Sequence, residues 1–338
     1  MTAMRVVSGI QPTGDLHLGN LLGAILRWVR MQDEAAQGTE LLFFLADLHA
    51  LTVEVDPTQL RANVREMAAA LIASGIDPAQ SIVFRQSAVR EHSELAWVLQ
   101  GTARMGWLNR MTQFKDKSGK NKEGSSVGLF TYPVLQAADV LLYNATHVPV
   151  GDDQKQHIEL ARDIALKFNN DFEVELFTVP EPFIGGGTAA RVMSLRDGSA
   201  KMSKSDPSDM SRINLTDSDE AIAQKVRKAR TDPDPIDADS TKLDARPEAK
   251  NLVGIYAAVT GSTVEGVTAQ FAGQGFGAFK PPLADALIAL IAPLRDRLVE
   301  LRANPAEIDR ILAAGADKAR ALAAPVLAEA YRAVGLSG

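Results

Sequence analysis

Apolar residues in the first half of the chain alternate between short compact runs and helical stripes. Four runs predict β-strands, at residues 5–7, 41–46, 81–84 and 147–150. Between these runs, apolar positions recur every three or four residues and predict amphipathic helices that begin at Leu18, Pro57, Glu94 and Gln154. Strands that alternate with helices favour an α/β fold with a parallel sheet, which binds ligands at the carboxyl ends of its strands.

The pattern changes near residue 205. A last strand is expected at Arg191–Leu195, and β-rich runs then stop. Helical periodicity dominates the rest of the chain, at residues 220–230, 249–259, 283–301 and 305–334. We therefore expect a Rossmann-type, parallel-sheet nucleotide-binding domain over residues 1–205 and a helical domain over 206–338.

Composition excludes several kinds of site. The 338-residue chain has no cysteine, which excludes thiolate zinc sites, iron–sulfur clusters and cysteine nucleophiles. Its five histidines are scattered, so no protein-bound metal site is expected. A net charge of −6 means that any RNA must be bound through local patches. The apolar stretch at 283–294 looks too short to span a bilayer, and no signal core follows Met1, so we expect a cytoplasmic protein without a membrane partner.

A glycine-rich turn follows the first predicted strand. It covers Ser8–Asn20 and opens a helix, whose free N–H groups attract phosphate. His17 and Asn20 share one face of the first helical turn, where both side chains can donate hydrogen bonds to an α-phosphate. The alternative is a helix cap with no role in chemistry.

A second constellation, Lys201–Ser205, follows the last predicted strand. Its two lysines, with hydroxyls between and beside them, suit a pyrophosphate leaving group. Taken singly, such a pentapeptide is usually a solvated loop. Together, the two segments resemble the HIGH and KMSKS signatures of class I aminoacyl-tRNA synthetases. The first signature is a variant, since Leu18 and Asn20 stand at its second and fourth positions.

One acid, Asp139, stands in an otherwise apolar helix over Tyr132–Tyr143. A buried carboxylate needs a donor, and an indole N–H is a donor without an acceptor. Gln136 and Tyr143 lie on the same helical stripe as Asp139, so a surface acid on a polar stripe is an equally good interpretation of the pattern alone.

A fourth constellation begins where the strand at 147–150 ends. Gly151 turns the chain, and Asp152, Asp153 and Gln154 open the next helix. The acids can accept ribose hydroxyls, and Gln154 can bind an α-amino group. Ordinary N-capping explains the acids as well, and both roles can hold together.

Over most of its length, the chain resembles the bacterial tryptophanyl-tRNA synthetases. The likeness is densest at residues 9–20, 111–117, 132–153 and 192–206. It implies that His17, Asn20, Lys201 and Lys204 are catalytic, with Lys117 as a helper. It implies an ATP site that comprises Gln11, Pro12, Thr13, Gly19, Asn20, Gly151, Asp152, Asp153, Val192, Met193, Lys201, Met202, Ser203, Lys204 and Ser205. It implies a tryptophan site that comprises Gly9, His49, Tyr132, Gln136, Asp139 and Gln154. Gln136 stands where many relatives carry Met, and Asp152 where Glu is more usual.

The resemblance also implies the reaction. Tryptophan would be activated with ATP, which brings Mg²⁺, and then transferred to the terminal adenosine of tRNA. Residues 1–205 would carry the catalytic site and a dimer-interface insertion of a homodimer, and residues 206–338 the anticodon-binding surface. The cluster Lys225, Arg227, Lys228 and Arg230 is a candidate RNA contact, although helix-end basic residues are more often simply solvated. The alternatives are a tyrosyl-tRNA synthetase, a nucleotidylyltransferase of the same superfamily and a noncatalytic RNA-binding paralogue.

Overall fold

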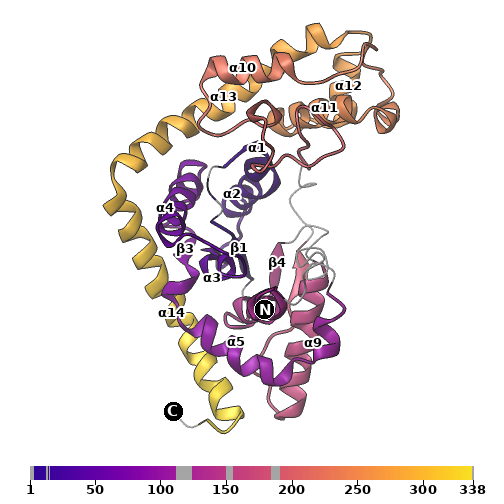
Figure 1. Ribbon diagram of the computed structural model, residues 1–338. Helices are drawn as coiled ribbons and strands as arrows, with labels where there is room; N and C mark the ends of the chain where they lie inside the picture. Colours follow the sequence, from indigo (N-terminus) through magenta and orange to yellow (C-terminus); the bar gives the residue numbers. More distant parts are fainter. Residues whose placement is uncertain are drawn as a thin grey trace.

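A five-stranded parallel sheet forms the centre of the computed structural model (Figure 1), which describes residues 4–12, 14, 16–111, 124–149, 155–183 and 191–336. The strand order is β3-β2-β1-β4-β5. The strands are β1 (Arg5–Ile10), β2 (Glu40–Leu45), β3 (Ile82–Arg85), β4 (His147–Pro149) and β5 (Glu181–Phe183). The α/β fold and four of the five strands are therefore as the apolar runs predict.

Two strand assignments differ from the sequence-based expectation. Residues 191–195 form no strand, and only an isolated bridge between Met193 and Lys201 is present there. The edge strand β5 was not predicted, because its three residues Glu181, Pro182 and Phe183 carry no apolar run.

Helices cover both faces of the sheet because β-strand side chains point alternately to opposite faces. Val6, Leu41 and Phe43 join the core formed with the helical segment α1 (Leu18–Asn20), a π-helical turn (Leu21–Ile25), α2 (Leu26–Asp33) and α4 (Pro57–Ala73). Val7 and Leu42 join the opposite core. That core packs against α5 (Glu91–Thr102), α8 (Val127–Leu141) and α9 (Lys155–Asp171). Two short helices, α3 (Asp47–Ala50) and α6 (Met105–Leu108), lie in the connections.

Helices make up the second part of the chain. They are α10 (Asp219–Lys228), α11 (Pro247–Thr260), α12 (Val264–Gln270), α13 (Phe276–Ala303) and α14 (Pro305–Ala333). Figure 1 shows α10–α12 and the start of α13 at one end of the molecule, while the rest of α13 and α14 run back past the central sheet.

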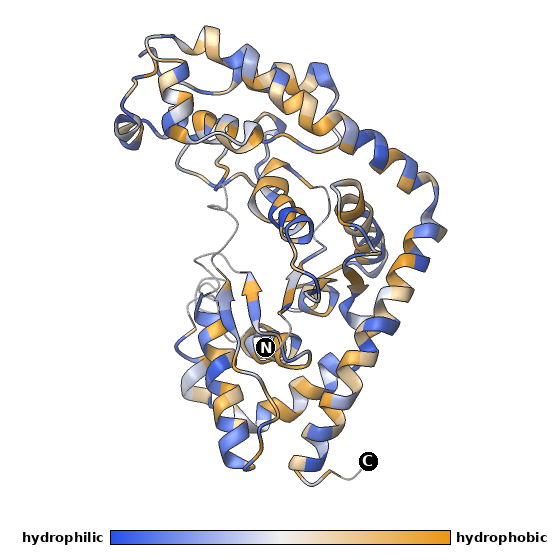
Figure 2. Cartoon of the chain, turned by 180° about the vertical axis from the view of Figure 1, so that it is seen from behind, coloured by the Kyte–Doolittle hydropathy of each residue, from blue (hydrophilic) through white to orange (hydrophobic). Residues whose placement is uncertain are grey.

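The helix α13 is longer than its sequence predicts. It has 28 residues and continues through Pro281, Pro282 and Pro293, so it extends beyond both ends of the helix expected at 283–301. By length and composition alone α13 could cross a membrane, a test that core helices of soluble proteins also meet. It packs here against α10, α11 and α4. Figure 2 shows hydrophobic and hydrophilic residues interleaved along it.

The C-terminal helix α14 packs on the edge of the sheet. Gly315 lies so close to β3 that a Cβ atom there would stand 1.8 Å from the carbonyl oxygen of Val83. Ala316, Ala319 and Ala323 are buried in the same core as β2 and α8. The last helix thus belongs physically with the sheet, while the domain boundary at 205/206 stays a prediction.

Candidate active site

The glycine-rich turn places His17 at the start of the first helix. His17 is the N-cap of α1, where its Nδ1 accepts from the N–H of Gly19 (3.1 Å). The backbone N–H of His17 donates to Asn20 Oδ1 (3.1 Å), which completes a capping box. The cap and the candidate catalytic role therefore coexist, because Nδ1 caps the helix while Nε2 carries the proton of the neutral ring.

Three cations surround His17. Burial, followed by the charges of Arg212, Lys201 and Lys204, lowers the pKa of His17 to about 4. The ring is therefore neutral near pH 7 and serves as a hydrogen-bond donor through Nε2. The same three positive charges form a field suited to a polyphosphate. Arg212 had no motif of its own in the sequence, since only its place in the fold brings it to His17.

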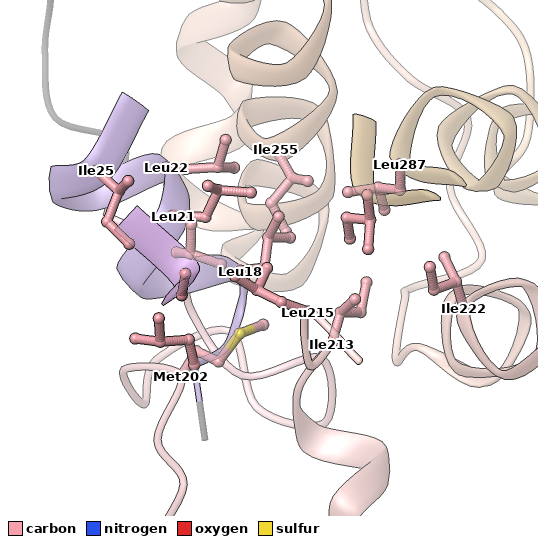
Figure 3. Close-up of a cluster of buried hydrophobic side chains, with 14 of the residues drawn as sticks. Leu18, Leu21, Leu22, Ile25, Met202, Ile213, Leu215, Ile222, Ile255 and Leu287 are labelled. Carbon is pink, nitrogen blue, oxygen red and sulfur yellow. The ribbon is translucent and has the colours of Figure 1, made fainter. Parts of the chain in front are cut away.

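The fold brings the two signature segments together. Leu18 N–H donates to the carbonyl of Ile213 (2.8 Å), and Leu215 N–H donates to the carbonyl of Leu16 (3.0 Å). A Cβ atom at Gly14 would lie 3.3 Å from Lys204 Nζ, so this lysine reaches the glycine-rich turn. Figure 3 shows the apolar floor of this junction, where Leu18 and Leu21 approach Met202, Ile213 and Leu215.

Val192 and Met193, two residues of the expected ATP site, lie in a tight hairpin with the lysine loop. Val192 carbonyl accepts from Met202 N–H (3.1 Å), so Val192 and the lysine loop are linked directly. Asn251 on α11 holds the next residue: its Oδ1 accepts from Met193 N–H (2.9 Å), and its Nδ2 donates to the Met193 carbonyl (3.0 Å). Asn251 was missed by sequence reasoning, because an amide inside a helical stripe carries no signal of its partner.

The lone acid of α8 is buried. Asp139 is 1% exposed, so the surface-acid interpretation was wrong. Its Oδ1 accepts from Gln86 Nε2 (2.6 Å) and His92 Nδ1 (2.7 Å), and its Oδ2 accepts from His49 Nε2 (2.7 Å). Burial alone would raise the pKa of Asp139, but the hydrogen bonds and the electrostatic interaction with His49 and His92 outweigh it and lower the pKa to about 2. A charged acceptor is therefore held inside the protein.

Other expected tryptophan-site residues lie around this acid. The Tyr132 ring meets that of His49 edge-on at 6.1 Å, and its hydroxyl is 3.0 Å from His157 Nε2. Burial raises the pKa of Tyr132 to about 12, so the hydroxyl keeps its proton. Gly9 lies at the carboxyl end of β1, where a Cβ atom would stand 2.4 Å from Phe44.

The remaining expected residues are placed as follows. Gln136 is half-buried on α8. Gln11 is exposed and Pro12 buried just beyond β1. Lys201, Lys204 and Ser205 are exposed, while Ser203 Oγ accepts from Ser205 N–H (3.1 Å). Six predicted residues lie outside the described part of the chain: Thr13, Lys117, Gly151, Asp152, Asp153 and Gln154.

The candidate RNA-binding cluster, three of whose residues lie on α10 and one just beyond it, does not form one surface. Lys225 is 2% exposed and pairs with Asp217 (2.6 Å) and Asp209 (2.7 Å). It therefore cannot contact RNA in this structure. Arg227 and Lys228 are exposed, and Arg230 approaches Glu248 (3.4 Å).

Known proteins share this arrangement over the whole chain. A family described as tRNA synthetases class I (W and Y) matches residues 1–292. A Tryptophan–tRNA ligase from Caulobacter vibrioides is 59% identical over 335 residues, which cover 99% of this chain and 96% of that protein. The chain belongs to the bacterial tryptophanyl-tRNA synthetases.

Two solved tryptophanyl-tRNA synthetases have the same fold. The enzyme from Mycoplasma pneumoniae matches with a TM-score of 0.86 at 32% identity, over 99% of each chain. The enzyme from Campylobacter jejuni, complexed with ADP and tryptophan, matches with a TM-score of 0.79 at 36% identity, over 98% of this chain and 100% of that one. The resemblance drawn from the sequence motifs is confirmed.

Proposed function

We propose that this synthetase activates L-tryptophan with ATP and then loads it onto tRNA. In the first step, the tryptophan carboxylate attacks the α-phosphorus of ATP, which forms tryptophanyl-adenylate and releases pyrophosphate. In the second step, a ribose hydroxyl of the terminal adenosine of tRNA attacks the activated carbonyl, and AMP leaves. Neither step needs a covalent nucleophile from the protein, so catalysis rests on positioning and charge stabilisation.

The buried carboxylate of Asp139 is the observation that carries the choice of amino acid. Oδ2 has one donor among the described residues, His49, whereas Oδ1 has two. A carboxylate has about four acceptor positions, so Oδ2 can take the indole N–H as a further donor. Phenylalanine would leave this position unpaired. Sites built around a substrate hydrogen bond reject analogues that lack it by roughly 10⁴–10⁵.

The cations around His17 support the first step. Nε2 of the neutral His17 and the amide of Asn20 would donate to the α-phosphate, while Lys201 and Lys204 would stabilise the departing pyrophosphate. Lys117 would assist them, as the family resemblance implies. Losing one such donor costs about 2.7–4 kcal/mol of barrier. Gln11 and the Val192–Met193 backbone would contact the nucleotide, and Gly151, Asp152 and Asp153 its ribose.

Mg²⁺ would enter with ATP as part of the substrate. Among the described residues, no group of three or more histidines and acids is arranged to hold a metal. Mg²⁺ commonly binds through substrate phosphates and a few waters, which fits a site rich in lysine and arginine.

The partners would be tRNA and a second copy of the chain, in the cytoplasm. The helical region 206–338 would bind the anticodon.

Three large apolar side chains are strongly exposed on helices that pack together: Trp97 on α5, Met105 on α6 and Val127 on α8. Exposed apolar patches commonly mark association sites, so this surface is our candidate for the dimer interface. Light scattering after gel filtration would test it, and a monomeric mass at micromolar concentration would contradict it.

Pyrophosphate exchange across the twenty amino acids tests the proposed function. We expect tryptophan-dependent exchange, with little from tyrosine or phenylalanine. Exchange that depends on tyrosine alone would instead establish a tyrosyl-tRNA synthetase. The variant Asp139→Ala should lose tryptophan activation far more than ATP binding, and unchanged exchange kinetics would show that the indole assignment is wrong.

A further inference from the structure

The carboxylate of Asp139 is held by a buried relay of two further side chains. His92 is 0% exposed and comes from α5, whereas Asp139 comes from α8. His92 Nδ1 lies 2.7 Å from Asp139 Oδ1, and His92 Nε2 lies 2.7 Å from the hydroxyl of Tyr143. All three side chains are buried, so no bulk water competes for these hydrogen bonds.

The chemistry of the three groups determines the direction of the hydrogen bonds. A carboxylate only accepts, so Nδ1 of His92 must carry a proton. In the neutral ring Nε2 is then the acceptor, and the Tyr143 hydroxyl donates to it. Burial raises the pKa of Tyr143 well above its ordinary value, so the hydroxyl retains the proton it donates. Tyr143 therefore selects the tautomer of His92 that can donate to Asp139.

Packing prevents the imidazole from turning away. The ring of His92 lies 5.8 Å from Phe44, 6.0 Å from Phe84 and 5.4 Å from Tyr143, measured between centroids. With Gln86 as a second donor, Oδ1 is occupied on both sides. The carboxylate cannot rotate without losing two buried hydrogen bonds, which leaves Oδ2 as the oxygen offered to a ligand.

We propose that His92, oriented by Tyr143, is a positioning residue that fixes Asp139 and thereby sets the selectivity for an amino acid with a ring N–H. The inference rests on the proposed role of Asp139 in binding the indole. Beyond that role, His92 and Tyr143, which lie outside the expected site, would control how strongly the enzyme prefers an amino acid with a ring N–H over one of the same shape that lacks it.

The test compares tryptophan with an analogue in which a benzothiophene ring replaces the indole, so that sulfur stands in place of N–H. The measured quantity is the ratio of kcat/KM for the two substrates in pyrophosphate exchange. Tyr143→Phe removes only the hydroxyl and should lower this ratio at least tenfold, mainly through KM for tryptophan. KM for ATP should stay unchanged. A residue with a purely structural role would affect both amino acids equally.

Two further variants and one control sharpen the result. His92→Leu should lower the ratio as well, whereas His92→Asn, which retains an N–H near the position of Nδ1, should recover part of it. Tyr331→Phe removes a hydroxyl that donates to Glu94 (3.0 Å) and serves as the matched control with an unchanged ratio. If His92→Leu fails to fold, Tyr143→Phe still tests the proposal, because phenylalanine keeps the aromatic ring of Tyr143.

The outcomes separate the two proposals. If the wild-type enzyme activates tryptophan but does not distinguish it from the analogue, then Asp139 does not bind the indole and the relay is refuted with it, while tryptophan activation itself stands. If the wild-type enzyme distinguishes the two, but Tyr143→Phe and His92→Leu keep the wild-type ratio, the role of Asp139 stands and the relay is refuted.

Discussion

Replacing Gly315 by alanine should push the C-terminal helix away from the edge of the sheet. The added Cβ would meet the carbonyl oxygen of Val83 at 1.8 Å, whereas real Cβ atoms essentially never approach closer than 3.0 Å. Because Val83 is paired to Phe43 in the parallel ladder, this oxygen cannot easily give way. The helix must therefore move outward by at least 1.2 Å, the difference between the two distances.

The energetic cost follows from that displacement. A radial gap of about 0.5–1 Å already forfeits a quarter to a half of each dispersion contact, and the neighbours Leu312, Ala316 and Ala319 are all buried. Overpacking of a core typically costs about 1–3 kcal/mol, and this clash with backbone belongs at the upper end. Alanine regains about 1 kcal/mol of helix propensity. We expect a net loss of about 2 kcal/mol in the free energy of unfolding.

Urea denaturation followed by circular dichroism measures this loss against a matched control. Gly254 also lies within a helix, α11, but a Cβ there would meet no atom within 4 Å. Gly254→Ala should therefore stabilise the protein by about 0.5–1 kcal/mol. The two variants carry the same chemical change and should shift the midpoint in opposite directions. Equal shifts, or a Gly315→Ala variant as stable as wild type, would refute the packing argument.

Three other predictions concern the site. Lys204→Ala should slow adenylate formation about 10²–10³-fold with little change in tryptophan affinity, and a normal single-turnover rate would rule out the lysine's role. Asn251→Ala should raise KM for ATP about tenfold and leave KM for tryptophan unchanged, because two hydrogen bonds to the Met193 backbone are lost; equal effects on both substrates would argue against it. The third is a pH effect. The pKa of His17 is lowered to about 4 from 6.5, so between these values the unfolded chain binds more protons and stability falls as the pH falls. Urea midpoints at both ends of the window should therefore differ less in His17→Gln than in wild type, and an identical difference would contradict the lowered pKa.

The sequence predicted those parts of the fold that depend on local pattern. Strands such as β2 and helices such as α4 are predictable because the spacing of their apolar residues can be seen within a short stretch of sequence. Features that depend on distant contacts or on small changes of backbone geometry escaped. The strand expected at 191–195 is instead held by Asn251 and by bonds to the lysine loop, which a local pattern cannot show. The π-helical turn at Leu21–Ile25 has the same apolar stripe as an ordinary helix.

The candidate site was predictable as a set of motifs but not as a network. His17 and Lys204 were identified from local residue types, and the structure brings them together. Two of the partners of Asp139 were not, because His92 and Gln86 are 47 and 53 residues away and look like ordinary helix or loop residues. Lys225 was assigned to a surface for the same reason, since its two acidic partners lie outside its own helix.

The pairing of Leu16 and Leu18 with Ile213 and Leu215 has a consequence for shortened forms of the enzyme. A polypeptide ending at residue 205 would contain both diagnostic motifs in full, yet it would lack the backbone groups at 213 and 215 that dock the first motif. It would also lack Arg212, one of the three positive charges near His17. The presence of both motifs is therefore not enough to predict activity: such a fragment would be recognised as a synthetase from its sequence, yet we expect it to be inactive.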